Sequence, residues 1–268
     1  MPAPEAEPLP VLDALHSTPA RRYLSAEPIP DDVIWAILDA AVRGPSGGNR
    51  QGWGWVVVTD PVIKRQVAEW YREGWSAAYG RRREQILAAP PAPDGLSRRS
   101  FLAAEHLADH IEEAPVWIFP VLRHAAGVDN PRLGASIYGA VQQLILAARA
   151  FGVGTTLTTL YAGHEDDLRE LLGLPDDALT MGLVPLGYPA RGRWAQPKRL
   201  PVEEVVHWDR WGAARPAAER PAAGASGSPE HQEGLSGRSA NLQLSFLRSA
   251  RGDDGWAEQE GLKPWARR

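Results

Sequence analysis

Gly134-Ala-Ser-Ile-Tyr-Gly-Ala-Val-Gln-Gln-Leu-Ile-Leu-Ala-Ala-Arg-Ala-Phe151 is the stretch that decides the fold class of this chain. Apolar residues fall on nearly every side of a helix drawn through it, which is typical of a helix buried inside a protein. Gly152 and Gly154 follow directly and end the helical pattern. The stretch therefore predicts a central helix that other elements cover on several sides.

Helices and strands surround this stretch in an irregular order. Helical patterns mark residues 31–41, 61–79, 99–112 and 165–172, whereas strand-sized apolar or β-rich runs mark residues 53–60, 116–122, 155–160 and 181–187. The intervening residues 80–97 are rich in Arg and Pro and are expected to be irregular. A buried helix among elements in such a mixed order predicts an α+β fold in layers rather than a doubly wound parallel sheet.

The composition divides the chain into three zones. Residues 1–10 are rich in Pro, Ala and Glu and are expected to form a flexible arm. Residues 11–212 carry the apolar periodicity of one folded domain. In residues 213–268, half of the side chains are Gly, Pro, Ala or Ser, which predicts a low-complexity, disordered extension. The alternative is an arm that clamps a partner subunit through Phe246, Trp256 and Trp265.

Composition also excludes several classes of protein. Lys and Arg number 29 against 33 Asp and Glu, so a broad nucleic-acid-binding surface is not expected. The absence of Cys excludes disulfides, thiolate nucleophiles and Cys-ligated clusters. The best apolar run, residues 116–122, is too short to span a membrane, and the acidic, Pro-rich start is unlike a secretion signal. A soluble, cytoplasmic protein is expected.

Common catalytic motifs are missing from the sequence. It contains neither a P-loop nor a Gly-x-Gly-x-x-Gly turn after a strand. His106 and His110 have the spacing of a zinc-binding helix, but the Glu of that motif does not lie between them, so no metal site is expected. Ser46 lacks the Gly-x-Ser-x-Gly context of a hydrolase nucleophile.

Two basic pairs and two small-residue loops are better candidates for a site. Arg21-Arg22 precedes the first long helix, and Lys198-Arg199 follows the last strand. Between them lie residues 45–51 and 154–159, whose glycines and short hydroxyl side chains let backbone N–H groups approach a planar, polar ligand. Cations and hydrogen-bond donors without a candidate acid, base or nucleophile indicate a cofactor that carries its own chemistry.

Five segments, in the right order, resemble motifs of the FMN-dependent nitroreductase family. They are Arg21-Arg22-Tyr23 with Glu27-Pro28-Ile29-Pro30, then Gly44-Pro45-Ser46-Gly47-Gly48-Asn49-Arg50-Gln51-Gly52-Trp53, Ala135-Ser136-Ile137-Tyr138 through Gly154 with Leu157-Thr158-Thr159, Pro185-Leu186-Gly187-Tyr188-Pro189, and Lys198-Arg199-Leu200-Pro201. The resemblance covers roughly residues 12–212. It implies a layered α/β/α sandwich, with a mixed, mostly antiparallel sheet around the buried helix.

The resemblance also implies an FMN site built across a homodimer interface. By this resemblance, Arg21 and Arg199 hold the phosphate, and the remaining cofactor-binding residues are Ser46, Gly47, Asn49, Gln51, Leu157, Thr158 and Thr159. Two departures from the family pattern are visible. Ser17 and Thr18 stand where relatives often have an arginine, and Gly52 replaces the usual proline before the tryptophan.

The family implies ping-pong chemistry, in which NADH or NADPH reduces FMN and an electron-poor acceptor such as a nitroaromatic or a quinone then takes the two electrons. No protein side chain is expected to be catalytic, because the flavin carries the chemistry. Residues 68–100 lie where this family often covers its substrate, so Tyr71, Trp75 and Tyr79 are candidates for stacking on the acceptor. The alternative is that these aromatic side chains pack inward.

Two further functions stay open. One is a specialised flavin enzyme of the same fold, either a reductive dehalogenase or a biosynthetic dehydrogenase. The halotyrosine dehalogenases resemble the chain around Thr158, but their Glu/Tyr/Lys clamp cannot be placed in residues 68–100. The other is a flavin-binding module without turnover, which steady-state oxidation of NADH or NADPH would distinguish from an enzyme.

Overall fold

The computed structural model describes residues 9–90, 97–128, 130 and 132–215. The longer helices are α1 (Val11–Ser17), α2 (Asp31–Ala41), α3 (Pro61–Tyr79), α4 (Arg83–Ala88), α5 (Arg98–His110), α6 (Tyr138–Ala150), α7 (Glu165–Leu172) and α8 (Val202–Val205). Short 3-10 turns are η1 (Gly47–Asn49), η2 (Gly80–Arg82), η3 (Ile111–Glu113), η4 (Leu133–Ser136) and η5 (Ala162–His164). The strands are β1 (Trp53–Val58), β2 (Val116–Leu122), β3 (Gly154–Thr155), β4 (Leu179–Thr180) and β5 (Val184–Gly187).

β2 is the centre of the sheet. The strand order is β1-β2-β5-β3, with β4 pairing with the end of β2, and each pairing between these strands is antiparallel. One edge of β2 pairs with the whole length of β1, and the other edge pairs first with β5 and then with β4. All seven residues of β2 are buried, as expected for a central strand with both faces covered.

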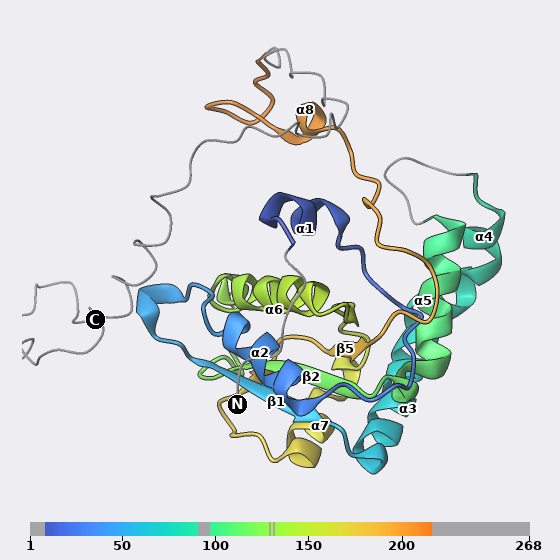
Figure 1. Cartoon of the computed structure of the whole chain (residues 1–268), viewed down its shortest axis with the longest axis vertical. Coiled ribbons are helices and arrows are strands. Elements are labelled where there is room, and N and C mark those ends of the chain that lie inside the picture. Colours follow the sequence, from blue (N-terminus) through green and yellow to red (C-terminus); the bar gives the residue numbers. More distant parts are fainter. Residues whose placement is uncertain (1–8, 91–96, 129, 131, 216–268) are drawn as a thin grey trace, which may run out of the picture. The chain divides into compact units, whose positions relative to one another are not determined.

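The side chains of β2 alternate between two hydrophobic cores. Val116, Ile118 and Leu122 belong to the first core, in which α2 and α6 pack on one face of the sheet. Trp117 and Phe119, with Val121, belong to the second core, which α3, α5 and α7 close on the opposite face. Figure 1 shows α6 and α7 on opposite sides of the sheet. The alternation of one strand between two cores produces the predicted three-layer α/β/α sandwich.

The central helix is less buried than the sequence predicted. α6 begins at Tyr138, after the turn η4, and only one of its faces is buried, through Val141, Leu144 and two alanines. Tyr138 itself is 43% exposed. The predicted buried helix is therefore confirmed along the face that covers the sheet, whereas the other residues of α6 are half-buried or exposed in a single chain.

Most predicted elements are confirmed, and the differences have physical reasons. α3 and α7 have the predicted bounds, and α2 begins at Asp31 as expected. β1 is half-buried rather than buried, because it is the edge strand and pairs only with β2. Residues 80–97 are not wholly irregular, since they include η2 and α4; residues 91–96 lie outside the described part.

The described chain falls into two compact units. The first ends at Val206, and the second begins at His207. In the second unit, His207 stacks against Trp211 with ring centroids 4.2 Å apart. The residues predicted as an alternative clamp, Phe246, Trp256 and Trp265, lie outside the described residues, as does most of the predicted N-terminal arm. No helix in the described residues is both long and apolar enough to cross a bilayer.

Candidate cofactor site

One group of predicted site residues lies on the loop that joins α2 to β1. Gly44 packs so closely on α6 that a Cβ atom there would lie 2.6 Å from the Cα atom of Ala140. Further along, the backbone N–H of Gly47 donates to Ser136 Oγ at 3.3 Å. These contacts seat the loop at the N-terminal end of α6. Glycine is required at the closest approach because any side chain would collide with the helix backbone.

The loop also holds its own shape through internal hydrogen bonds. Ser46 Oγ accepts from the backbone N–H of Gln51 at 3.0 Å, and the Ser46 carbonyl accepts from the N–H of Asn49 at 3.0 Å. Gln51 Nε2 donates to Asn49 Oδ1 at 3.3 Å. Gly48, Asn49 and Gln51 all have φ between 50° and 60°, and Gly47 to Gln51 are exposed. The structure thus brings together Ser46, Gly47, Asn49 and Gln51 on one open, donor-rich turn, as the sequence predicted.

Arg21 lies at the other end of α6. Its backbone N–H donates to Thr155 O at 2.7 Å, and a Cβ on Gly154 would lie 2.8 Å from Arg21 Cβ. The guanidinium donates to three consecutive carbonyls, those of residues 191, 192 and 193, at 2.8 to 3.0 Å. Of the five N–H donors of a guanidinium, these bonds use three and leave two for a ligand. Arg21 is therefore buried and anchors a turn of the chain, which its predicted role did not include.

Further cations gather around Arg21. Arg149 lies 4.2 Å from the centre of the Trp194 ring, and Arg21 lies 5.0 Å from the same ring. Burial lowers the pKa of Arg21, and the positive charges of Arg149 and Arg99 lower it further. The charges that act on Arg21 in the described part of the chain are thus of its own sign. A bound anion would relieve this repulsion.

The predicted ring-edge segment begins two residues beyond Thr155. Leu157 and Thr159 are exposed, whereas Thr158 is held by two backbone hydrogen bonds with Leu183, at 3.0 and 2.8 Å. The Thr158 hydroxyl forms a hydrogen bond of 2.9 Å with the hydroxyl of Tyr71 from α3. The segment therefore presents one apolar side chain and two hydroxyls from a fixed backbone.

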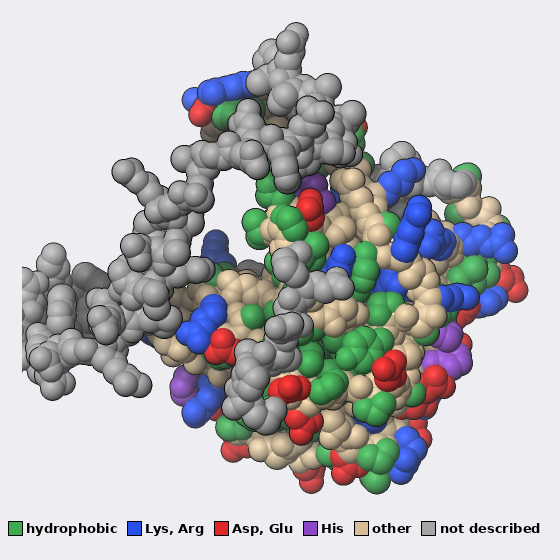
Figure 2. Space-filling view, viewed as in Figure 1, with side chains coloured by type: hydrophobic (Ala, Val, Ile, Leu, Met, Phe, Trp, Pro, Cys, Tyr) green, Lys and Arg blue, Asp and Glu red, His purple; other side chains and the backbone are tan. Residues whose placement is uncertain are grey.

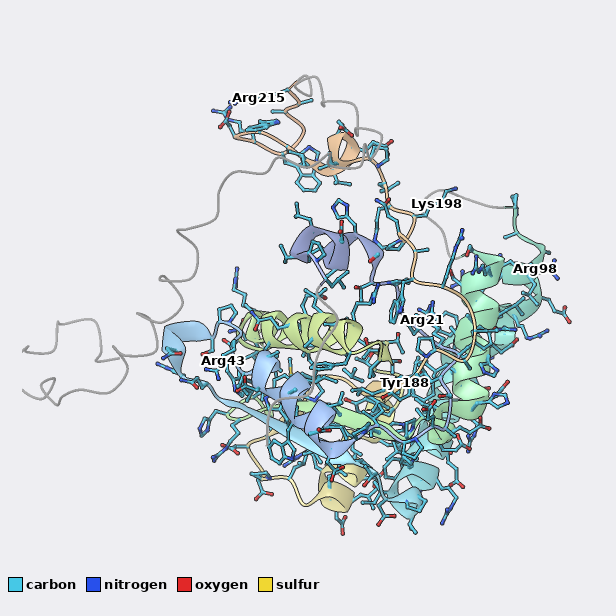
Figure 3. The ribbon with its side chains drawn as sticks, viewed as in Figure 1. Arg21, Arg43, Arg98, Tyr188, Lys198 and Arg215 are labelled. Carbon is cyan, nitrogen blue, oxygen red and sulfur yellow. The ribbon has the colours of Figure 1, made fainter. Side chains whose placement is uncertain are left out.

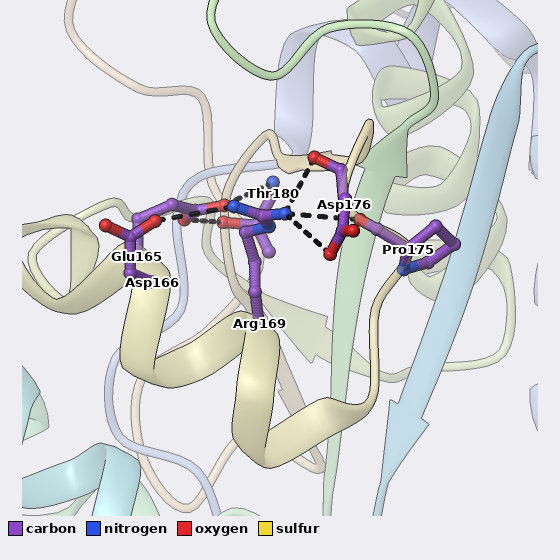
Figure 4. Close-up of polar contacts among 6 residues, drawn as sticks. All are labelled: Glu165, Asp166, Arg169, Pro175, Asp176 and Thr180. Atoms are coloured by element: carbon purple, nitrogen blue, oxygen red, sulfur yellow. Dashed lines mark hydrogen bonds and ion pairs between the residues drawn. The ribbon is translucent and has the colours of Figure 1, made fainter.

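A second hydroxyl network fixes the chain just beyond this segment. Tyr161 Oη and Thr180 Oγ1 form a hydrogen bond of 2.7 Å, and Thr180 N donates to Glu165 Oε1 at 2.8 Å. Thr180 Oγ1 also donates to the same carboxylate (Figure 4). Burial raises the pKa of Glu165, and it also raises the pKa of Tyr161. This network joins α7 to β4.

The predicted substrate residues are placed differently from the prediction. Tyr71 is only 2% exposed and belongs to the second core, so its ring cannot stack on a bound acceptor; that prediction is wrong because the apolar ring packs inward. Trp75 and Tyr79 are half-buried and pack together at 4.6 Å between ring centroids, with Phe101 of α5 beside them. The inward-packing alternative fits these aromatic side chains better.

Arginines of η2 and α5 form an exposed basic surface. Arg81, Arg82, Arg98 and Arg99 are exposed, whereas Arg83 binds Glu105 with two hydrogen bonds of 2.6 and 3.1 Å. Figure 2 shows Lys and Arg side chains gathered over this end of the first unit, and Figure 3 labels Arg98 there. The positive charge of Arg99 lowers the pKa of Arg21, so this surface lies within electrostatic reach of the cofactor site.

Arg199 is not joined to Arg21 in the described chain. It is exposed, and its guanidinium donates to the carbonyl of its neighbour Lys198 at 2.9 Å. Figure 3 places Lys198 on the segment that follows β5. The predicted pairing of Arg21 with Arg199 around one phosphate therefore stays a prediction.

Sequence reasoning missed two features of the site. It did not find that the carbonyls of residues 191–193 hold Arg21, because backbone acceptors leave no sequence signal. It also missed a stack in which Arg191 lies 3.3 Å from the ring centre of Tyr23, with His106 and His110 next in line at 4.2 Å each. The i, i+4 spacing of the two histidines was visible, but their aromatic partner is distant in sequence.

The two groups of site residues lie at opposite ends of α6. The helix has 13 residues, so its ends are about 20 Å apart at 1.5 Å per residue. The exposed turn at residues 46–51 offers neutral donors, and the far end offers the cations around Arg21. The hydroxyls of residues 158 and 159 and the side chain of Leu157 lie a few residues further along the chain, beside Leu183. This donor set fits FMN, which has an anionic phosphate, a hydroxylated chain and a planar ring with a polar edge. One chain alone, however, holds these two groups apart.

Comparisons with known proteins show which proteins this chain resembles. A model described as "Nitroreductase family" matches residues 16–188. The chain is 32% identical to an NADH dehydrogenase of Thermus thermophilus over 75% of its own length and 98% of that protein. It is 28% identical to iodotyrosine deiodinase 1 of Rattus norvegicus, over 69% of its own length and 64% of that protein. A solved structure of the FMN and NADPH-dependent nitroreductase NfnB from Sphigopyxis sp. strain HMH superposes with a TM-score of 0.57 at 21% identity, covering 76% of this chain and 100% of that one.

Proposed function

Because the chain belongs to the nitroreductase family, we propose that it moves two electrons from NADH or NADPH to an electron-poor acceptor by a ping-pong mechanism. Family membership makes it an FMN-dependent oxidoreductase. The reductant, the acceptor and the order of the two half-reactions are the finer part of the proposal. Nitroaromatics and quinones are the acceptor classes that the proposal names first.

The observation that carries the proposal is the separation of the two groups of site residues by α6. In a two-fold homodimer whose axis crosses α6, each end of the helix in one subunit lies beside the other end of the same helix in the partner, because both subunits use the same patch. We infer that each site combines the turn at residues 46–51 of one subunit with Arg21 and residues 157–159 of the other. The partly exposed outer face of α6 then becomes part of the interface.

Within such a site, the residues of this chain bind the cofactor and orient it. Arg21 and its neighbouring cations attract the phosphate, the turn at residues 46–51 offers N–H and amide donors, and Leu157 covers an apolar part of the ring. When bound, FMN supplies the two-electron chemistry. The exposed arginines of η2 and α5 would attract an anionic reductant toward the site.

The first experiment measures cofactor and turnover. Purified protein should be yellow and carry about one FMN per chain, and anaerobic addition of NADH or NADPH should bleach it. Reoxidation is then followed with nitroaromatics, quinones and halophenols. Colourless protein that also refuses added FMN would refute the proposal. Flavinated protein that oxidises neither nucleotide would be the non-catalytic module instead.

A second experiment tests the shared site. Asn49→Glu and Leu157→Glu each add a negative charge at an exposed position in a different half of the site. Each variant alone should lose FMN. In an unfolded and refolded equimolar mixture, half of the dimers are heterodimers, and each heterodimer has one undamaged site of two. FMN content should therefore return to about a quarter of the wild-type value, from random pairing. No recovery would contradict the shared site.

Reductive dehalogenation is a second candidate, favoured by the similarity to iodotyrosine deiodinase 1. Against it, residues 65–100 contain no lysine, so a Glu/Tyr/Lys clamp for a zwitterionic substrate cannot be assembled from this stretch. Halide release from a halophenol at a rate that exceeds nitroaromatic reduction would favour this candidate over the main proposal.

A further inference from the structure

The hydroxyl of Tyr71 is the group that contacts Thr158, in the proposed cofactor-binding segment of residues 157–159. Its ring lies on the buried face of α3 and is 2% exposed in the second core, while its hydroxyl lies 2.9 Å from Thr158 Oγ1. The contact joins residues 87 positions apart in the chain. A buried tyrosine hydroxyl needs such a partner, because an unpaired one would be costly.

The rest of Thr158 is already committed. Its backbone N–H donates to Leu183 O, and its carbonyl accepts from Leu183 N–H. Next to this bridge, Gly182 has a φ of 147°, and a Cβ there would lie 2.6 Å from Leu157 Cδ1. The backbone of the segment is thus fixed from both sides. The side-chain hydroxyl is the polar group of Thr158 whose direction is still open.

The acidity of the Tyr71 phenol determines in which direction the hydroxyl hydrogen of Thr158 points. Either hydroxyl can donate in this pair, and because a phenol is a stronger acid than an aliphatic alcohol, the favoured arrangement has Tyr71 as donor and Thr158 Oγ1 as acceptor. Burial raises the pKa of Tyr71, which keeps the phenol protonated and able to donate at ordinary pH. With its oxygen engaged by Tyr71, Thr158 directs its own hydroxyl hydrogen away from the core and toward the open side of the segment.

We propose that Tyr71 is a positioning residue, which orients the Thr158 hydroxyl as a hydrogen-bond donor toward the edge of the flavin ring. The inference rests on the proposed function, since it needs FMN bound beside residues 157–159. A donor at the ring edge favours the reduced, more electron-rich ring over the oxidised one. Tyr71 therefore contributes to the reduction potential of the cofactor without touching it.

Tyr71→Phe removes the orienting donor and keeps the buried ring. We expect the relative affinity for reduced over oxidised FMN to fall by up to about tenfold, which lowers the two-electron midpoint potential by about 30 mV. Thr158→Val should give a similar shift, and the double variant should add little to it. Thr158→Ser retains the hydroxyl and should keep a potential near that of the wild type.

Tyr161→Phe is a matched control. Tyr161 is also buried, at 1% exposure, and also pairs with a threonine hydroxyl, that of Thr180, but this pair joins the chain just before η5 to β4. Both phenylalanine variants should lower thermal stability, whereas only Tyr71→Phe should shift the potential, measured by equilibration with a reference dye. Equal shifts in both variants, or an unchanged potential in flavinated Tyr71→Phe and Thr158→Val, would overturn the inference alone. Wild-type protein that binds no FMN would overturn the proposed function and this inference with it.

Discussion

Replacing Arg21 by lysine should release the turn at residues 191–193. The guanidinium reaches three consecutive carbonyls at once, with Nη1 on one and Nη2 on the other two. Arg21→Lys keeps the positive charge, but its single nitrogen lies on a shorter side chain and does not reach the position of Nη2, which holds two of the three carbonyls. Two charge-assisted hydrogen bonds are then lost, while the charge near the proposed phosphate site is retained.

The size of the effect follows from the number of bonds. A hydrogen bond to a charged group contributes about 1.5–3 kcal/mol, so two of them contribute about 3 kcal/mol at the lower end of that range. A loss of about 3 kcal/mol increases the population of the open turn more than a hundredfold. The cation–π contact of Arg21 with Trp194 would weaken as well, which acts in the same direction.

Limited trypsin digestion measures this opening, because residues 191–199 contain four Lys or Arg residues. When opening is fast relative to cleavage, the cleavage rate follows the open population, so it should rise by about two orders of magnitude. Arg43→Lys is the control, since Arg43 pairs only with exposed Asp39 and should change the rate little. Unchanged cleavage at residues 191–199, or cleavage that rises equally throughout the domain, would refute the role assigned to Arg21.

Three further predictions concern the framework of the site. Gly44→Ala should place a Cβ inside contact distance of the Ala140 backbone, lower the free energy of unfolding by about 1–3 kcal/mol and reduce FMN content, as measured by chemical denaturation and by acid release of the flavin. Leu144→Ala should cost about 2–5 kcal/mol, because this side chain is fully buried on the inner face of α6; a smaller loss would contradict its place in the core. The two carboxylates that flank His164 raise its pKa above the ordinary value of 6.5, so its stabilising effect is complete below that pH and is lost as pH rises through the higher folded value. The wild type should therefore have a higher melting temperature than His164→Gln at acidic pH, and the two melting temperatures should converge at alkaline pH. In high salt, the difference between them should depend less on pH.

Local patterns in the sequence were sufficient to predict most elements. α3 begins at Pro61, after Asp60, whose side chain accepts from the N–H of Val62, and this capping pattern is visible in the sequence itself. β2 was predicted as a strand because a short apolar run between turns is typical of a buried strand. The edge position of β1 could not be predicted, because the neighbours of a strand depend on the chain topology rather than on its own residues.

The candidate site was predictable in its loops and not in its long-range contacts. The turn at residues 46–51 follows from its glycines and small polar residues, and the structure forms it as expected. Tyr71 was assigned to the substrate because an aromatic residue on a helix gives no sign of which way it points. Its true partner is 87 residues away, and the carbonyls that hold Arg21 are about twice as far along the chain. Contacts of this kind arise only when the two layers close on the sheet.

The two faces of β2 differ in chemistry, and this difference makes the strand sensitive to a change in its length. Val116, Ile118 and Leu122 present branched aliphatic side chains to one core, whereas Trp117 and Phe119 present large rings to the other. Deleting or inserting a single residue would exchange the faces and place an indole where a methyl-rich layer is packed. Side chains along this strand can therefore be replaced one at a time, whereas a change in the number of its residues would disturb both cores at once.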